Sequence, residues 1–271
     1  MPELPEVETT RRGIEGALLG RRVVNLVVRE RRLRWPIQRA IEAQVAGQRV
    51  NGTGRRAKYL LIELDSGTLI SHLGMSGSLR VVAQSTPPQR HDHFDLRLDS
   101  GQCLRFNDPR RFGSLHWTRQ DPAKHRLLAG LGPEPLGAEF NAGYVAAMAK
   151  GRKVAVKQFL MDQRVVVGVG NIYASEALFR AGIHPGRAAG RIAERRLAAL
   201  VEAVRATLAE AIEQGGTTLR DYVDPAGRPG YFRQQLFVYE RAGRPCRQCD
   251  RPVRRFVQGQ RATYYCPVCQ T

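Results

Sequence analysis

The chain has 271 residues, of which 42% are hydrophobic, and this is enough to bury a core in one large domain or two ordinary ones. Lys and Arg number 43 against 25 acidic residues, giving a net charge of +18 and a pI near 10.6. So basic a chain is expected to bind a polyanion, and no basic amphipathic helix favours a membrane surface instead. The acidic start and short apolar runs argue against a secretory signal or a membrane span. We therefore expect a cytosolic protein, in which structural disulfides are rare.

The opening segment, MPELPEVETTRRG, is typical of a helix start. Pro5 suits the first position of a helix because its fixed φ fits and its missing N–H is not needed there. Glu6 and Glu8 then lie at the end of the helix dipole that favours negative charge. The helical spacing continues to Leu18, and Gly20 is the predicted stop.

The helix start does not explain Pro2. If Met1 is removed, Pro2 becomes a secondary amine beside the carboxylate of Glu3. An α-amine titrates near neutral pH and can attack a sugar aldehyde to form a Schiff base. From these residues alone a simple helix start is the favoured interpretation, and an amine nucleophile with an acid/base partner is the alternative.

Short strands with regular turns are expected after this helix. Residues 22–35 and 58–64 are rich in β-branched and apolar side chains, and Asp-Ser-Gly turns at 65–67 and 99–101 separate further apolar segments. This spacing predicts a β-sandwich or barrel that extends to about residue 130.

The pattern changes at LGPEPL, residues 131–136, whose Gly and two prolines predict a linker. Helices are expected at 141–150 and 154–163, and a long helix is expected to end at Gly215-Gly216. The predicted fold is an α+β multidomain chain, with a β domain at 1–130, a hinge at 131–140, a helical domain at 141–236 and a cysteine module at 237–271.

The cysteine module carries CRQC at 246–249 and CPVC at 266–269. Two C-x-x-C pairs at this separation predict a closed, structural site for one Zn²⁺ with four thiolate ligands, which are Cys246, Cys249, Cys266 and Cys269. The arginines between the pairs, Arg251, Arg254, Arg255 and Arg261, predict a phosphate-binding tip. Cys103 stands apart in an apolar strand and is expected in the core.

A glycine-rich segment, VVGVGNIYASEALF at 166–179, precedes a predicted helix. Gly168 and Gly170 would let the backbone approach a ligand closely, and the exposed N–H groups around Asn171 could bind phosphate. A simple turn between two helices explains the same glycines equally well.

Two further segments, HLGMSGSL at 72–79 and NDPRRFGSL at 107–115, place apolar and basic side chains on loops. Met75 or Phe112 beside Arg110 would suit insertion into a base stack, although a core position is the simpler interpretation of both apolar residues. Lys58, His91 and Arg152 would each pass as surface residues when considered alone.

Taken together and in this order, these segments resemble bacterial formamidopyrimidine-DNA glycosylases. The resemblance rests on MPELPEVE, GRRAKYLL, HLGMSGSL, HDHFDL, DPRRFG, VVGVGNIYASE, GGTTL and the cysteine module, and it covers nearly the whole chain. The opening PELPE is more similar to this family than to the related endonuclease VIII branch, which typically opens with PEGPE.

The resemblance implies a bifunctional base excision repair enzyme. Such an enzyme removes oxidised purines, chiefly 8-oxoguanine opposite cytosine and formamidopyrimidines, and then cleaves the strand by β,δ-elimination. The implied fold is an N-terminal β-sandwich with flanking helices, a helix–two-turn–helix domain and a zinc finger, with DNA in the cleft between the halves.

The resemblance also implies roles for individual residues. Pro2 matches the nucleophile, Glu3 the acid/base residue, and Lys58 and Arg261 the residues assigned to the eliminations. The matched DNA contacts are His72, Met75, His91, Arg110, Phe112, Arg152 and Asn171. Residues 217–233 match a loop that covers the extruded base, with Arg220 near it.

The implied partner is damaged double-stranded DNA, bound by a monomer in the cytoplasm, associated with the nucleoid. Beyond the structural zinc, neither a catalytic metal nor an organic cofactor is expected, because an amine can attack without either. Two alternatives stay open: an endonuclease VIII-like relative for oxidised pyrimidines, and a non-catalytic, zinc-stabilised DNA-binding protein.

Overall fold

The amino-terminal helix, α1 (Leu4–Leu18), begins one residue before Pro5, the predicted first position, and ends before Gly20, the predicted stop. Glu3 is its N-cap residue, and Pro5 lies in the first turn. The Glu3 N–H donates to Glu6 Oε2 at 2.8 Å, which satisfies one of the amides that a helix start leaves without a partner. Gly20 follows the helix with a φ of +76°. The helix-start interpretation of Pro5 is confirmed, and Pro2 lies just before the cap.

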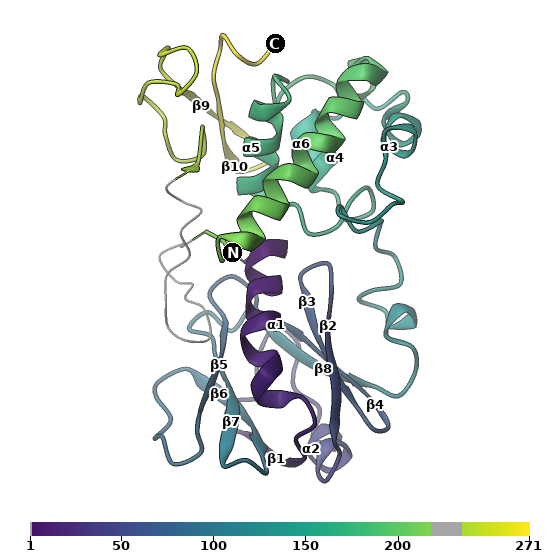
Figure 1. The fold of residues 1–271 in the computed structure, drawn as a ribbon, viewed down its shortest axis with the longest axis vertical. Coiled ribbons are helices and arrows are strands. Elements are labelled where there is room, and N and C mark those ends of the chain that lie inside the picture. The colour runs from purple at the N-terminus through teal and green to yellow at the C-terminus, as the bar shows by residue number, and fades with distance from the viewer. Residues whose placement is uncertain (1, 218–234) are drawn as a thin grey trace. The chain divides into compact units, whose positions relative to one another are not determined.

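The computed structural model describes residues 2–217 and 235–271, which fall into two compact units (Figure 1). In its described part, unit 1 comprises residues 2–129 and 214–217, and unit 2 comprises residues 130–213 and 235–271. Most of the loop at 217–233, with Arg220, lies outside the described residues, as does Met1.

Unit 1 is built around two four-stranded antiparallel sheets, in the orders β1-β6-β7-β5 and β2-β3-β4-β8 (Figure 1). Leucines from both sheets, such as Leu26, Leu60 and Leu104, belong to one buried cluster, so the sheets pack as the predicted sandwich. The strands are β1 (Val23–Val28), β2 (Val50–Arg56), β3 (Tyr59–Leu64), β4 (Gly67–His72), β5 (Ser78–Ala83), β6 (Asp92–Leu98), β7 (Gln102–Asn107) and β8 (Ser114–Thr118).

The helices of unit 1 flank this sandwich. Val7, Ile14 and Leu18 of α1 are buried in its core cluster. The short helix α2 (Ala40–Val45) adds two more buried side chains, and a 3₁₀ turn, η1 (Pro122–Lys124), follows the last strand. The core therefore fixes α1, and with it the position of Pro2.

The strand predicted at 22–35 is too long, because β1 ends at Val28. Arg29 N and Glu30 N both donate to His93 O, and Arg34 N donates to Gly113 O, so the chain leaves the ladder there. The residue types at 29–35 continue the strand-like pattern of the sequence, so the pattern did not indicate that the backbone changes its hydrogen-bond partners after Val28.

Unit 2 contains the predicted helices, although two of them are shorter than expected. Its helices are α3 (Ala142–Ala149), α4 (Val156–Met161), α5 (Asn171–Arg180), the 3₁₀ turn η2 (Ala189–Arg191) and α6 (Glu194–Glu213). Helix α5 contacts α4, α6 and strand β10, so it is the centre of the unit (Figure 1).

The cysteine module follows in the same unit and contains the hairpin β9 (Arg254–Gln258) and β10 (Arg261–Tyr265). Its entry is fixed by Glu176 of α5, a fully buried carboxylate that accepts N–H groups of Phe237, Val238 and Tyr239 at 2.7, 3.0 and 2.8 Å. Burial raises the pKa of Glu176, and these three hydrogen bonds oppose the shift. Among the described residues, no helix has the length and apolar character needed to cross a membrane.

Candidate functional site

The candidate nucleophile and its neighbours are buried in unit 1. Pro2 is buried, Glu3 is 2% exposed and Lys58 is 4% exposed. Lys58 lies in the turn between β2 and β3, beside Ala57, which adopts a φ of +55°. A lysine and a glutamate are rarely buried without a specific reason, so both positions are consistent with a functional role.

Side-chain pairs between α1 and β2 show that Lys58 lies at the same end of α1 as Pro2. Thr53 Oγ1 donates to Glu15 Oε1 at 2.9 Å, whereas Arg55 Nε donates to Glu8 Oε2 at 3.3 Å. Later residues of β2 therefore pair with earlier residues of α1, so the strand runs toward the first turn of the helix. The β2–β3 turn continues this direction and brings Lys58 to the amino end of the helix.

Glu6 connects this end of α1 to the segment that follows α6. Its Oε2 accepts the Glu3 N–H, and its Oε1 accepts the N–H and the hydroxyl of Thr217, each at 2.9 Å. Gly216 has a φ of +80°, and a Cβ atom there would lie 2.9 Å from Glu6 Oε1. Thr217, where the predicted covering loop begins, is thus tied through one carboxylate to Glu3, the residue that follows the candidate nucleophile.

His72 lies at the end of β4, opposite Tyr59, with ring centroids 4.9 Å apart. Burial, with Lys58 as the next cause, lowers the pKa of His72 to about 4. The ring is therefore neutral at neutral pH. Because Nδ1 accepts the Gly74 N–H at 2.9 Å, the ring proton is on Nε2, which can donate to an anion.

Met75 and Phe112, for which a core position was the simpler interpretation, are exposed instead. Their exposed fractions are 37% and 41%, values that are high for large apolar side chains. The guanidinium of Arg110 stacks on the Phe112 ring at 4.9 Å. The core interpretation is therefore wrong for both residues. An apolar side chain and a stacked arginine at loop tips can instead enter a base stack, which was the other interpretation of these segments.

Two candidate DNA-binding residues of unit 2, Asn171 and Arg261, lie next to one carbonyl group, that of Ala262. Ala262 O accepts from Asn171 Nδ2 at 3.1 Å and from Lys157 Nζ at 3.1 Å, and Lys157 Nζ also donates to Thr263 Oγ1 at 2.8 Å. Arg261 precedes this carbonyl and is exposed just after the tight turn at 259–260. No motif in the sequence indicated Lys157, which is 2% exposed.

Because Lys157 holds the backbone next to Arg261, we expect Lys157→Met to weaken the binding of duplex DNA with an abasic-site analogue about tenfold. Met keeps the length of the side chain but cannot donate to Ala262 O or Thr263 Oγ1. Fluorescence anisotropy would measure the dissociation constant. Lys124→Met, which removes the same charge at an exposed site in unit 1, is the control. Equal affinities of the two variants would contradict the positioning role.

The four cysteines of the module come together as a metal site. Their Sγ atoms all lie within 4.8 Å of one another, and no other group of three or more possible ligands is found in the described part of the chain. Backbone N–H groups of Gln248 and Cys269 point at the sulfurs of Cys246 and Cys266. Four thiolates in such a closed set fit one structural Zn²⁺. Cys103 is buried in β7, as expected.

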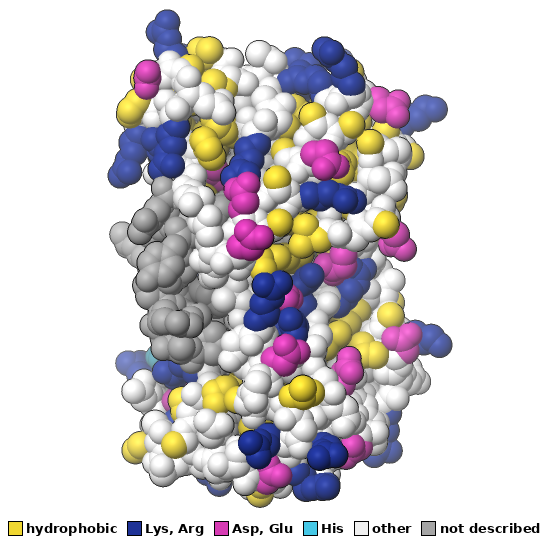
Figure 2. Space-filling view, in the orientation of Figure 1, with side chains coloured by type: hydrophobic (Ala, Val, Ile, Leu, Met, Phe, Trp, Pro, Cys, Tyr) yellow, Lys and Arg dark blue, Asp and Glu magenta, His cyan; other side chains and the backbone are white. Residues whose placement is uncertain are grey.

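The remaining predicted DNA contacts differ in their surroundings. Arg152 is exposed after α3, and His91 lies before β6 with a φ of +73°, which is unusual for a residue other than glycine. On the face shown in Figure 2, basic and acidic side chains are interspersed. Along helix α1, Glu8 pairs with Arg11 and Arg12, and Glu15 pairs with Arg11. The large net positive charge is therefore not concentrated on this face.

Comparison with protein families accounts for most of the chain. Models of the formamidopyrimidine-DNA glycosylase N-terminal domain and H2TH domain match residues 1–115 and 131–223. A model of the zinc finger found in FPG and IleRS matches residues 243–271. The chain belongs to the formamidopyrimidine-DNA glycosylase family. A curated family member, the formamidopyrimidine-DNA glycosylase of Syntrophotalea carbinolica, is 59% identical over the full length of both chains.

Solved structures of the family share the fold. The MutM (Fpg) protein from Thermus thermophilus is 42% identical, with a TM-score of 0.89 over 99% of this chain and 98% of that one. The Lactococcus lactis Fpg is 30% identical, with a TM-score of 0.92 over 99% of both chains, in complexes with DNA containing an abasic site or Fapy-dG. The expected family fold, with sandwich, H2TH domain and zinc finger, is confirmed.

Proposed function

We propose that the chain is a bifunctional DNA glycosylase and DNA-(apurinic or apyrimidinic site) lyase of base excision repair. Its substrates are oxidised purines, chiefly 8-oxoguanine and formamidopyrimidines, in duplex DNA. The observation that carries the proposal is the buried Pro2 directly before α1, with Glu3 as the helix cap and Lys58 at the same end of the helix. Family membership over the whole chain and the DNA complexes of the Lactococcus neighbour support it.

Base removal begins with the amine of Pro2, which is free once Met1 is removed. Its nitrogen lone pair attacks C1′ of the damaged nucleotide, and the bond from C1′ to the base breaks. The base leaves with the electron pair of the broken bond and takes up a proton. The sugar ring then opens to give an iminium on Pro2. Glu3 is the proton donor and acceptor for these steps, so it must change protonation state during the reaction.

Strand cleavage uses the iminium as an electron sink. Removal of a proton from C2′ expels the 3′ phosphate, which is the β-elimination, and a second elimination expels the 5′ phosphate. Lys58 and Arg261 serve these two steps, Lys58 from the buried turn at the amino end of α1 and Arg261 from the exposed hairpin of unit 2. Water finally releases Pro2 from the sugar fragment.

Binding supplies the energy to extrude the base, which costs a few kcal/mol. His72, His91, Arg152 and Asn171 are the proposed DNA contacts, and Met75, Arg110 and Phe112 fill the gap that the base leaves. The net charge of +18 supports binding to the backbone of DNA. Arg220 would lie near the extruded base. The protein would act as a monomer on the nucleoid, in the cytoplasm.

The test is an excision assay with three duplexes: 8-oxoguanine opposite cytosine, an oxidised pyrimidine, and undamaged DNA. We expect excision of 8-oxoguanine with a gap that carries phosphates at both ends, and no cleavage of undamaged DNA. Faster excision of the oxidised pyrimidine would favour an endonuclease VIII-like activity. Tight binding without any excision would favour a non-catalytic DNA-binding protein.

A further inference from the structure

The carboxylate of Asp108 joins two loops of unit 1. Under the proposed function, both loops enter the DNA duplex. Asp108 is fully buried, just after β7. Its Oδ1 accepts from Ser76 Oγ at 2.9 Å and from Arg110 N at 3.2 Å, and its Oδ2 accepts from Gly113 N at 2.8 Å. One side chain thus holds the loop that carries Met75 and the turn that carries Phe112.

The two loops also touch backbone against backbone. A Cβ atom on Gly74, which has a φ of +69°, would lie 2.5 Å from both Gly113 N and Phe112 C. A Cβ atom on Gly113 would lie 2.8 Å from His72 O. No side chain fits between these segments, so the two loops form one packed unit. Met75 and Phe112 therefore project from this unit rather than from independent loops.

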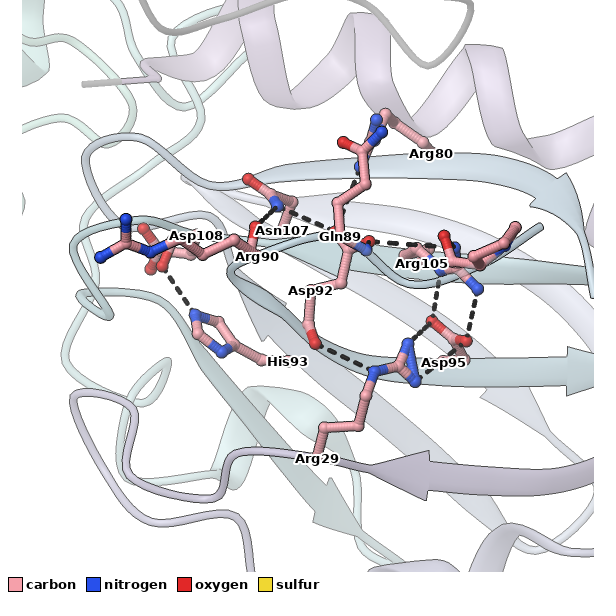
Figure 3. A network of polar contacts seen from close by, with 11 residues as sticks. Arg29, Arg80, Gln89, Arg90, Asp92, His93, Asp95, Arg105, Asn107 and Asp108 are labelled. Atoms are coloured by element: carbon pink, nitrogen blue, oxygen red, sulfur yellow. Dashed lines mark hydrogen bonds and ion pairs between the residues drawn. The ribbon is translucent and has the colours of Figure 1, made fainter.

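The backbone of Asp108 ties a third segment, which carries His91, to these two loops. Asp108 N donates to His91 O at 3.0 Å. His93 Nε2 lies 2.7 Å from Asp108 O, and this second contact is drawn in Figure 3. The first of these bonds helps to hold His91 in its left-handed conformation, which needs support from its surroundings. His91 is itself one of the proposed DNA contacts.

A buried ionic network anchors the third segment to the sheet (Figure 3). Asp92 Oδ1 accepts from Asn107 Nδ2 at 2.8 Å and Asp92 Oδ2 accepts from Gln89 N at 2.7 Å. Farther along the strands, Arg105 forms a two-bond pair with Asp95, at 2.9 Å for each bond. Such a network resists displacement, because separating any pair leaves a charge buried without its partner.

We propose that Asp108 is a positioning residue that makes the Met75 loop, the Arg110–Phe112 turn and His91 one preformed unit, which enters the duplex as a single piece. The inference rests on the proposed function. It adds that the order of the two loops is established during folding, so that little of the DNA-binding energy is spent on arranging them. Asp108 itself touches neither the base nor the sugar.

Asn cannot replace Asp108 in this role. The two oxygens of the carboxylate each accept a backbone N–H, Oδ1 that of Arg110 and Oδ2 that of Gly113. A side-chain amide has only one oxygen that can accept. The Ser76 hydroxyl can reverse and accept, but a backbone N–H cannot. In Asp108→Asn, at least one of the amides of Arg110 and Gly113 therefore meets an NH₂ group. Ser76→Ala is the milder change, because it removes only the bond to the Met75 loop.

The test compares two DNA substrates with the full-length protein. Excision from a duplex with 8-oxoguanine opposite cytosine requires base extrusion and insertion of the loops. Borohydride trapping on a single strand with an abasic site requires only the Pro2 amine. We expect Asp108→Asn to slow duplex excision about tenfold or more, and Ser76→Ala to slow it less, while trapping on the single strand stays within about twofold for both.

Asp99→Asn and Ser100→Ala, at the exposed turn between β6 and β7, are matched controls and should keep duplex excision unchanged. Wild-type rates of duplex excision in both Asp108→Asn and Ser76→Ala would overturn the inference. An equal loss on both substrates would overturn it too, since this would indicate a general structural defect. If the wild-type protein itself neither excised nor trapped, the proposed function would fail, independently of Asp108.

Discussion

Replacing Glu3 with Gln is expected to lower the rate of base excision about a thousandfold, while lesion DNA is still bound. Gln has the shape of Glu and still accepts a hydrogen bond, but it cannot take up or release the proton. The bond from the Glu3 N–H to Glu6 involves only the backbone of residue 3, so the start of α1 is preserved in the variant. The loss should therefore appear in the chemical step and not in the fold.

Single-turnover excision of 8-oxoguanine from a duplex would measure this effect, with the dissociation constant determined in parallel. Glu15→Gln, on the same helix, is the matched control, because Glu15 pairs with Arg11 and lies far from the amino end. An excision rate for Glu3→Gln equal to that of the wild type would show that Glu3 is only a helix cap.

Loss of the zinc is expected to have the second large effect, on DNA binding. The module has a small core, in which the buried Cys246 and Cys266 pack with Phe179, Val238 and Val253. So few apolar residues cannot hold the hairpin without the metal, because zinc binding supplies much of the folding energy of such modules. In Cys249→Ser we expect zinc content well below one ion per chain and duplex DNA binding weakened about a hundredfold.

Metal analysis of the purified protein and anisotropy with duplex DNA would test this prediction. Cys103→Ala provides the control, because Cys103 belongs to a strand of unit 1 and is no zinc ligand. It should retain one zinc ion per chain and normal DNA binding. Full DNA affinity in zinc-free Cys249→Ser would show that the arginines of the hairpin do not depend on the metal for their position.

The features that the sequence predicts well are those set by nearby residues. The two C-x-x-C pairs each bring two sulfurs together through a tight local turn, so their spacing alone predicts the zinc site. Pro5 and Gly20 mark the ends of α1 for similar reasons, since both act through their own backbone angles. The resemblance of many short motifs in one order then points to the family.

The features that the sequence did not reveal depend on contacts between distant segments. Lys157 lies in an apolar helix and is inconspicuous until its Nζ is seen against Ala262 and Thr263, more than a hundred residues away. Asp108 is an ordinary turn residue in sequence, but its three donors come from two different loops. Met75 and Phe112 were ambiguous because apolar type alone does not distinguish a core side chain from an exposed wedge.

The most direct test of the proposed function is to identify the residue that becomes linked to DNA. The full-length protein would be incubated with duplex DNA containing 8-oxoguanine opposite cytosine, in the presence of borohydride, and the adduct would be analysed by peptide mass spectrometry. We expect a crosslink on an amino-terminal Pro2, with Met1 absent, and its loss in Pro2→Gly. A crosslink on a lysine, or none at all while the DNA is tightly bound, would contradict the amine mechanism and leave Pro2 as part of a helix start.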